Sequence, residues 1–82
     1  MITNLQIRAA RALLGWDQGR LAERAQVSII TVKRLEAAAD QLQAHFATVM
    51  KIKRAVENAG VEFVSGDGRV GVVRLQKRPQ RR

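Results

Sequence analysis

The residues best suited to chemistry lie between positions 28 and 34, where a lysine and an arginine follow a serine and two isoleucines. Lysine and arginine donate hydrogen bonds to guanine O6 and N7, and isoleucine packs on thymine methyl groups. Helical spacing places these side chains outward, opposite Val32 and Leu35. We therefore predict a helix that reads base edges in the major groove. The predicted base-reading residues are Ser28, Ile29, Ile30, Lys33 and Arg34.

Two short helices joined by a tight turn must position this face. Residues 17–25 predict an amphipathic helix with Asp17 as its cap and Ala22 on its buried face. Because Ala22 carries only a methyl group, a second helix can cross it closely, at the angle of about 90–120° typical of helix-turn-helix units. Ser28 is expected to cap that second helix. For Ile29, burial beneath the turn is the alternative to contact with DNA.

The segments on either side predict two further helices. Asn4 is expected to cap a first helix that ends at Gly15. Residues 38–44 read as a connector, and helical spacing resumes from His45 to Gly60. The recurring apolar positions are Leu5, Ala9, Ala12 and Leu13 in the first helix and Phe46, Val49, Ile52 and Val56 in the last.

The last part of the chain changes from helical to β periodicity. Residues 61–75 contain two β-branched runs separated by Gly66-Asp67-Gly68, which predicts a β-hairpin. An isolated hairpin is marginally stable in water and leaves its edges unpaired. We therefore expect it to pair with a second copy of the chain, through Val61, Phe63, Val72 and Val73. The alternative is that the hairpin packs on its own helices and completes the core of the monomer.

The composition is that of a small basic domain. With 82 residues the chain gains only marginal stability alone, which favours a dimer. Fifteen Lys and Arg against seven Asp and Glu give a formal charge of +8, so a nucleic acid is the expected partner. The absence of cysteine suits a reducing cytoplasm. We expect a cytoplasmic protein, because the sequence has neither a signal-peptide pattern nor an apolar run of about 18 residues.

The ordered pattern over residues 4–60 resembles the Cro/CI-type (XRE) helix-turn-helix family of bacterial and phage transcriptional regulators. The chain departs from that family at Gln26, where glycine is usual because the turn often has a positive φ. A non-glycine residue in this geometry costs about 1 kcal/mol, which a packed domain can absorb. The residues that carry the resemblance are Arg11, Leu13, Gly15, Gln18, Leu21-Ala22, Val27-Ser28, Val32 and Leu35-Glu36.

The resemblance implies a four-helix Cro/CI-like helix-turn-helix domain (1–60). With the C-terminal β-hairpin (61–76) predicted above, the expected fold is mainly α. Residues 77–82 are basic and without apolar side chains, so we expect them to be disordered alone. The implied function is that of a sequence-specific transcriptional regulator, a repressor and autoregulator of the kind carried by mobile elements. Two copies would bind double-stranded DNA at inverted-repeat operators with half-sites about one helical turn apart.

The resemblance also implies roles for residues beside the reading helix. Gln18 matches a position that binds a backbone phosphate at a helix N-terminus. Arg11 and Glu36 match positions that form an internal ion pair, which would act as a scaffold. Weaker candidates for phosphate contact are Arg20, His45, Thr48 and Lys51.

Other classes of function are less well supported by the residues. The single histidine, the missing cysteines and the scattered acids provide no catalytic constellation, and we expect neither an enzyme nor a cofactor or metal site. The main alternative is a DNA-binding antitoxin of a toxin–antitoxin pair, which would need an apolar hairpin surface that stays open in the dimer. A further alternative is an RNA-binding or structural chromosome protein that uses charge alone and therefore has weak site preference.

Overall fold

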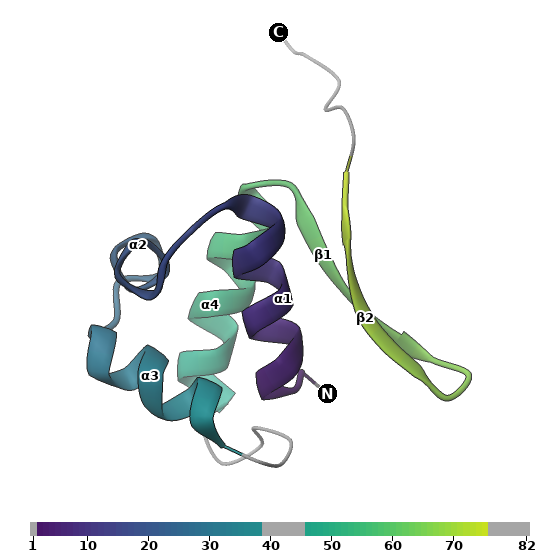
Figure 1. Ribbon diagram of the computed structural model, residues 1–82, viewed down its shortest axis with the longest axis horizontal. Coiled ribbons are helices and arrows are strands. Elements are labelled where there is room, and N and C mark those ends of the chain that lie inside the picture. Colours follow the sequence, from purple (N-terminus) through teal and green to yellow (C-terminus); the bar gives the residue numbers. More distant parts are fainter. Residues whose placement is uncertain (1, 39–45, 76–82) are drawn as a thin grey trace, which may run out of the picture.

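The computed structural model describes residues 2–38 and 46–75, and in these ranges the chain forms four helices followed by an antiparallel hairpin (Figure 1). This confirms the expected mainly helical layout with a C-terminal hairpin. Residues 39–44 of the connector, His45 and the basic tail fall outside the described residues. The elements are α1 (Asn4–Leu14), α2 (Gln18–Ala25), α3 (Ile29–Ala37), α4 (Phe46–Asn58), β1 (Val61–Gly66) and β2 (Arg69–Arg74).

Side-chain caps set the start of the first three helices. Asp17 accepts from the amide of Arg20, and Ser28 accepts from the amide of Thr31, as expected for the caps of α2 and α3. The predicted cap of α1 is wrong, because Thr3 rather than Asn4 holds that position. Thr3 and Gln6 form a reciprocal capping box that pairs two otherwise orphaned backbone donors.

The turn between α2 and α3 contains the predicted left-handed residue. Gln26 ends α2 with φ 61° and ψ 46°, and its amide hydrogen-bonds to carbonyl groups of the last turn. Gly15 ends α1 in the same geometry, with φ 69° and ψ 27°. The chain therefore accepts backbone strain at Gln26 in order to turn sharply into α3.

The core lies between the helices and the start of the hairpin. Its largest fully buried side chains include Leu21 of α2 and Val32 and Leu35 of α3, so the predicted inner faces of these two helices are confirmed. In α4 the buried residues are Val49, Ile52 and Val56, also as expected.

Four apolar positions were assigned wrongly to the core, because Leu5, Ala12 and Leu13 of α1 and Phe46 of α4 are all exposed. In α1 the buried residues are Gln6, Ile7 and Ala10, whereas Leu5 is 63% exposed. Phe46 is 66% exposed at the start of α4. These errors arise because helical spacing alone does not say which of two apolar stripes meets the rest of the molecule.

The hairpin is tighter than the sequence suggests. Gly66 pairs with Arg69, which leaves a two-residue turn of Asp67 and Gly68, with φ 55° and 74°. Positive φ at both central residues is the geometry that matches the twist of hairpin strands and favours Asp-Gly. Since cross-strand partners share a face, one face carries Val61, Phe63, Ser65, Val70, Val72 and Arg74, and the other Glu62, Val64, Gly71 and Val73.

The first of these faces packs on the chain's own helices. Gln6 of α1 donates from Nε2 to the carbonyl groups of Val64 and Gly71, at 2.9 and 2.8 Å. One Arg74 guanidinium nitrogen donates to the carbonyl of Leu13 at the end of α1. Of the two arrangements considered for the hairpin, the structure therefore has the one in which it covers the monomer core, while its tip extends beyond the helices (Figure 1).

This packing changes which hairpin residues are free to meet a second copy. Val61 is fully buried, and Phe63 and Val72 are half-buried against the same core. Val61 is therefore wrong as a dimer contact, because its side chain has no surface left to offer. Val73 is 45% exposed and Val64 is 39% exposed, and both lie on the outer face.

None of the described helices is both long and apolar enough to cross a lipid bilayer. The longest of them, α4, has 13 residues, whereas a membrane-spanning helix needs about 20 mostly apolar residues.

Candidate nucleic-acid interface

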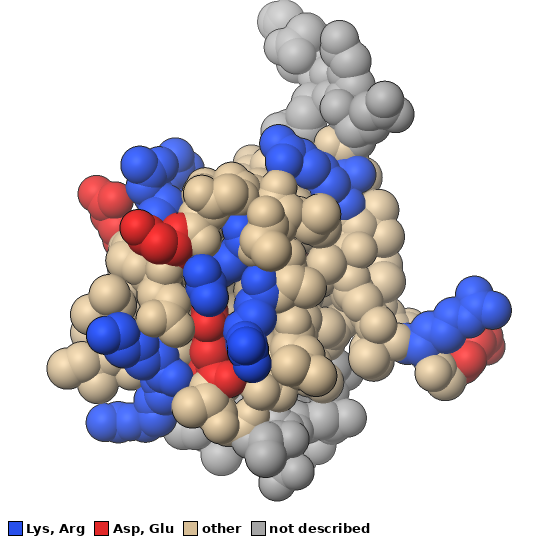
Figure 2. Space-filling view, viewed as in Figure 1, with Lys and Arg blue, Asp and Glu red and all other residues tan. Residues whose placement is uncertain are grey.

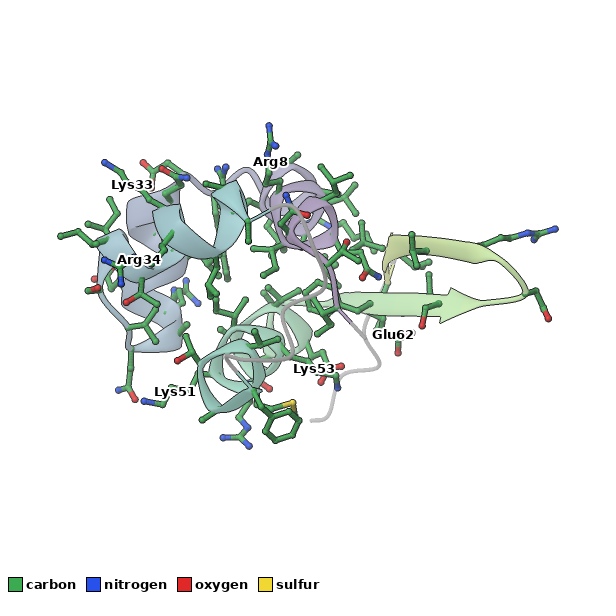
Figure 3. All side chains as sticks on the ribbon, turned by 90° about the horizontal axis from the view of Figure 1, so that it is seen from below. Arg8, Lys33, Arg34, Lys51, Lys53 and Glu62 are labelled. Atoms are coloured by element: carbon green, nitrogen blue, oxygen red, sulfur yellow. The ribbon has the colours of Figure 1, made fainter. Side chains whose placement is uncertain are left out.

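The outward face of α3 carries all of the predicted base-reading side chains. Lys33 and Arg34 are exposed, and in Figure 3 both project from α3 away from the other helices. Ile30 is 61% exposed and Ile29 is 41% exposed, so Ile29 is not buried beneath the turn. An exposed pair of β-branched apolar residues beside two cations is available to a partner that offers both methyl groups and hydrogen-bond acceptors.

Ser28 has a structural task at the start of this face. Its hydroxyl accepts from the amide of Thr31 at 3.0 Å and shares a second hydrogen bond with the Thr31 hydroxyl at 2.9 Å. The residue is nevertheless exposed. It therefore fixes the first turn of α3 and still leaves one donor or acceptor position of its hydroxyl toward solvent.

Glu36 joins three helices beneath the exposed face of α3. The guanidinium of Arg11 in α1 binds its carboxylate in a bidentate manner, from Nε at 2.7 Å and from Nη2 at 2.9 Å. Gln18, the first residue of α2, donates from Nε2 to the same carboxylate at 3.0 Å. The Glu36 side chain is only 4% exposed. The ion pair predicted between Arg11 and Glu36 is therefore present and sets the position of α3 relative to α1 and α2.

The environment of Arg11 favours its charged form. The hydrogen bonds to Glu36 raise the pKa of Arg11 above its ordinary value, with a further contribution from the negative charge of that residue. Arg11 also donates from Nη1 to the carbonyl of Trp16 at 3.1 Å. The stability that a raised arginine pKa contributes is complete below the ordinary arginine pKa and is lost as the pH rises through the raised one, so Arg11 keeps its charge across the physiological range.

The predicted phosphate-binding residues do not form one cluster. Gln18 is half-buried and uses one amide hydrogen for Glu36, which leaves its other amide hydrogen free of any described hydrogen bond to protein. Arg20 is exposed, and its Nε lies 3.8 Å from Oε1 of Glu23, which makes a loose surface ion pair. Thr48 is half-buried on α4, and Lys51 is exposed on the same helix.

Cations border α3 on both sides. Arg8 of α1 and Lys33 line a shallow hollow whose floor contains Arg11, Gln18 and Glu36. Figure 2 shows lysine and arginine side chains over α1 and α3, with acidic atoms between them. In Figure 3, Arg8 and Lys33 project on one side of the molecule and Lys51 on the opposite side, with Arg34 between them.

Sequence reasoning missed two residues of this region. Gln6 is 3% exposed and ties α1 to the hairpin, and the spacing Thr3-x-x-Gln6 is a capping-box pattern that would have located it. Arg8 lines the same hollow as Lys33, although 24 residues separate them in the chain. No local pattern predicts that proximity, because it depends on how α1 packs against α3.

Among residues 2–38 and 46–75, no group of three or more His, Asp or Glu side chains is arranged to hold a metal ion. The sequence matches no protein-family model, and a search of curated proteins finds no significant relative. Inferences about function therefore depend on the geometry described above.

Proposed function

We propose that this protein is a sequence-specific DNA-binding transcriptional regulator, a repressor and autoregulator, in which α2 and α3 act as a helix-turn-helix unit. One observation carries the proposal: the exposed face of α3 bears Lys33 and Arg34 beside two isoleucines, while Glu36 on its buried side is hydrogen-bonded to α1 and α2. A major groove accommodates one α-helix, and its floor presents a distinct set of donors, acceptors and methyl groups for each base pair.

The side chains of α3 suggest a division of roles. Lys33 and Arg34 donate to guanine O6 and N7, and a well-formed arginine pair contributes about 1–3 kcal/mol of discrimination. Ile29 and Ile30 lie at the leading end of α3, where they favour thymine methyl groups. The proposed complex therefore prefers half-sites that combine G·C and T-containing steps.

Phosphate contacts hold this helix in register. In helix-turn-helix complexes the first helix crosses the DNA backbone, so the N-terminus of α2 at Gln18 faces a phosphate. The formal charge of +8 adds long-range attraction to the polyanion. Binding is expected to weaken steeply with salt, with a slope of log Kobs against log salt near −0.9 per phosphate contacted.

The functional unit is proposed to be a homodimer. Val64 and Val73 form an exposed apolar strip on the outer face of the hairpin, on the side away from the chain's own core. A two-fold axis through that strip presents two copies of α3 to one flank of the duplex. The expected operator is an inverted repeat with half-sites about 34 Å apart.

Selection of bound duplexes from a random DNA pool tests the proposed function. The wild-type protein is expected to enrich an inverted repeat, and Arg34→Ala to lose or change the preference at one position of each half-site. Arg69→Ala is the matched control, because it removes one exposed arginine from the hairpin turn, away from α3. Absence of any enriched repeat with the wild-type protein would contradict the proposal.

A further inference from the structure

A second hollow, between α2 and α4, gathers three cations. Arg24 from the last turn of α2 lines it together with Lys51 and Arg54 of α4, and the amide side chains of Gln26 and Asn58 complete its polar lining. No acidic residue is among the described residues that line it. Within the described part of the chain, none of the three cations has an ion-pair partner.

This concentration of positive charge contrasts with the rest of α4. Two residues along from Lys51, Lys53 pairs with Glu57 at 2.7 Å. Lys51 and Arg54 are three positions apart and are therefore neighbours on the helix surface, where like charges destabilise a helix. The guanidinium of Arg24, whose carbon lies 5.2 Å from the centroid of the Trp16 ring, adds a third positive charge. A bound anion would relieve the repulsion among these three cations.

The hollow adjoins the leading end of α3. Gln26, which lines the hollow, forms the turn after α2, and α3 begins three residues later at Ile29. Because the second helix of such a unit lies in the major groove, a DNA backbone runs along each side of it, so phosphates flank α3 on both sides. Lys51 projects on the side of α3 opposite to Arg8 (Figure 3), so the two hollows border the reading helix from opposite sides.

The geometry points to a DNA backbone phosphate as the occupant of the hollow between α2 and α4. Arg24, Lys51 and Arg54 hold this phosphate on one side of the major groove, while Gln18 meets the backbone on the other side. Arginine and lysine form short, charge-assisted hydrogen bonds to phosphate oxygens. The inference rests on the proposed function and adds to it a second, sequence-independent anchor that fixes how deeply α3 enters the groove.

The salt dependence of DNA binding tests this site. The double variant Lys51→Gln/Arg54→Gln is compared with Lys53→Gln/Arg69→Gln, which removes the same two charges outside the hollow. Each protein is titrated with the selected operator at several salt concentrations. Loss of one phosphate contact makes the slope of log Kobs against log salt shallower by about 0.9 in the first variant. The control keeps the wild-type slope, and both variants keep the wild-type base preference.

Folding and free anions are checked in parallel. Because like charges are removed from exposed positions, the melting temperature of Lys51→Gln/Arg54→Gln is expected to be no lower than that of the wild type. An equal change of slope in both double variants, or no change in either, would overturn the phosphate site. The phosphate site would also be overturned by a second outcome. In it, inorganic phosphate alone shifts the NMR signals of Lys51 and Arg54, but Lys51→Gln/Arg54→Gln keeps the wild-type slope of log Kobs against log salt.

The two proposals fail in different ways. If the wild-type protein selects an operator in an Arg34-dependent manner while the hollow variant keeps the wild-type slope, only the phosphate site is wrong. If the wild-type protein binds no duplex, the proposed function is wrong and the phosphate site with it.

Discussion

Glu36 is the residue on which the orientation of α3 most depends. Its buried carboxylate receives donors from α1 and α2, and its backbone carbonyl accepts from the side chain of Asn4 at 3.1 Å. A buried carboxylate without its partners is costly, whereas a pair of well-packed apolar residues in the same space is often neutral. We therefore expect the pair to fix an orientation rather than to add net stability.

A double-mutant cycle tests this interpretation. We expect Arg11→Met to lower the free energy of unfolding by about 3 kcal/mol, because it strands the Glu36 carboxylate. In the Glu36→Leu background the same change should cost much less. Urea unfolding followed by the fluorescence of Trp16, the single tryptophan, measures all four proteins. Equal losses in both backgrounds would show that the two side chains do not act as a pair.

The candidate site was predictable from sequence only where it depends on one helix. The outward position of Lys33 and Arg34 follows from the 3.6-residue period once Val32 and Leu35 are assigned to the core. The hollow lined by Arg24, Lys51 and Arg54 was not predictable as a unit, although Lys51 was a candidate alone. Its residues come together only through the packing of α2 on α4.

At the scale of the elements, the turn between α2 and α3 keeps a residue that strains the backbone. Gln26 and Gly15 both end a helix in left-handed geometry, but only Gly15 lacks a Cβ. A Cβ built on Gly15 meets no atom within 4 Å, so a substitution there would carry the backbone cost alone. The two positions therefore form a matched pair for measuring that cost.

We expect Gln26→Gly to raise the free energy of unfolding by up to about 1 kcal/mol, because glycine adopts positive φ without steric cost. Gly15→Ala is expected to lower it by a similar amount. Chemical denaturation at fixed salt measures both changes. Destabilisation by Gln26→Gly would mean that the Gln26 side chain contributes more in the turn than its backbone strain costs.

Local sequence patterns predicted α2, α3 and the place of the hairpin turn, but failed for the buried face of α1. Leu5 and Ala9 form one apolar stripe, and Ile7 and Ala10 form another, and both have helical spacing. The structure buries the second stripe, together with Gln6, against the other helices and the hairpin. That choice is made by tertiary packing, which a single helix does not encode.

At the scale of the whole molecule, the hairpin has two faces with different tasks. Its inner face completes the core of the monomer through Val61. Its outer face leaves Val64 and Val73 exposed as diagonal neighbours, with Glu62 opposite Val73 and no described element over them. A small domain with an exposed apolar strip and a marginal core gains stability when two copies associate.

Val73→Lys is expected to weaken association of the protein at least tenfold without unfolding the helices, because it places a charge in the apolar strip. Ser65→Lys is the control, since it adds the same charge to an exposed position on the other face of the hairpin. Sedimentation equilibrium measures association, and circular dichroism measures helix content. Binding to an isolated half-site should be unaffected.

If Val73→Lys associates like the wild type, the outer face of the hairpin is not the dimer contact. A dimer that leaves Val64 and Val73 open would instead meet the condition set for the antitoxin alternative, in which a toxin covers this strip. The same sedimentation experiment therefore separates the two arrangements.

Helix α1 contacts both the hairpin and α3. Through Gln6 it is bonded to both strands of the hairpin, and through Arg11 it is bonded to Glu36 at the back of α3. If a second copy docks on the hairpin and α3 enters a groove, as proposed, both contacts bear on α1. Substitutions that loosen α1 are then expected to weaken association and DNA binding together.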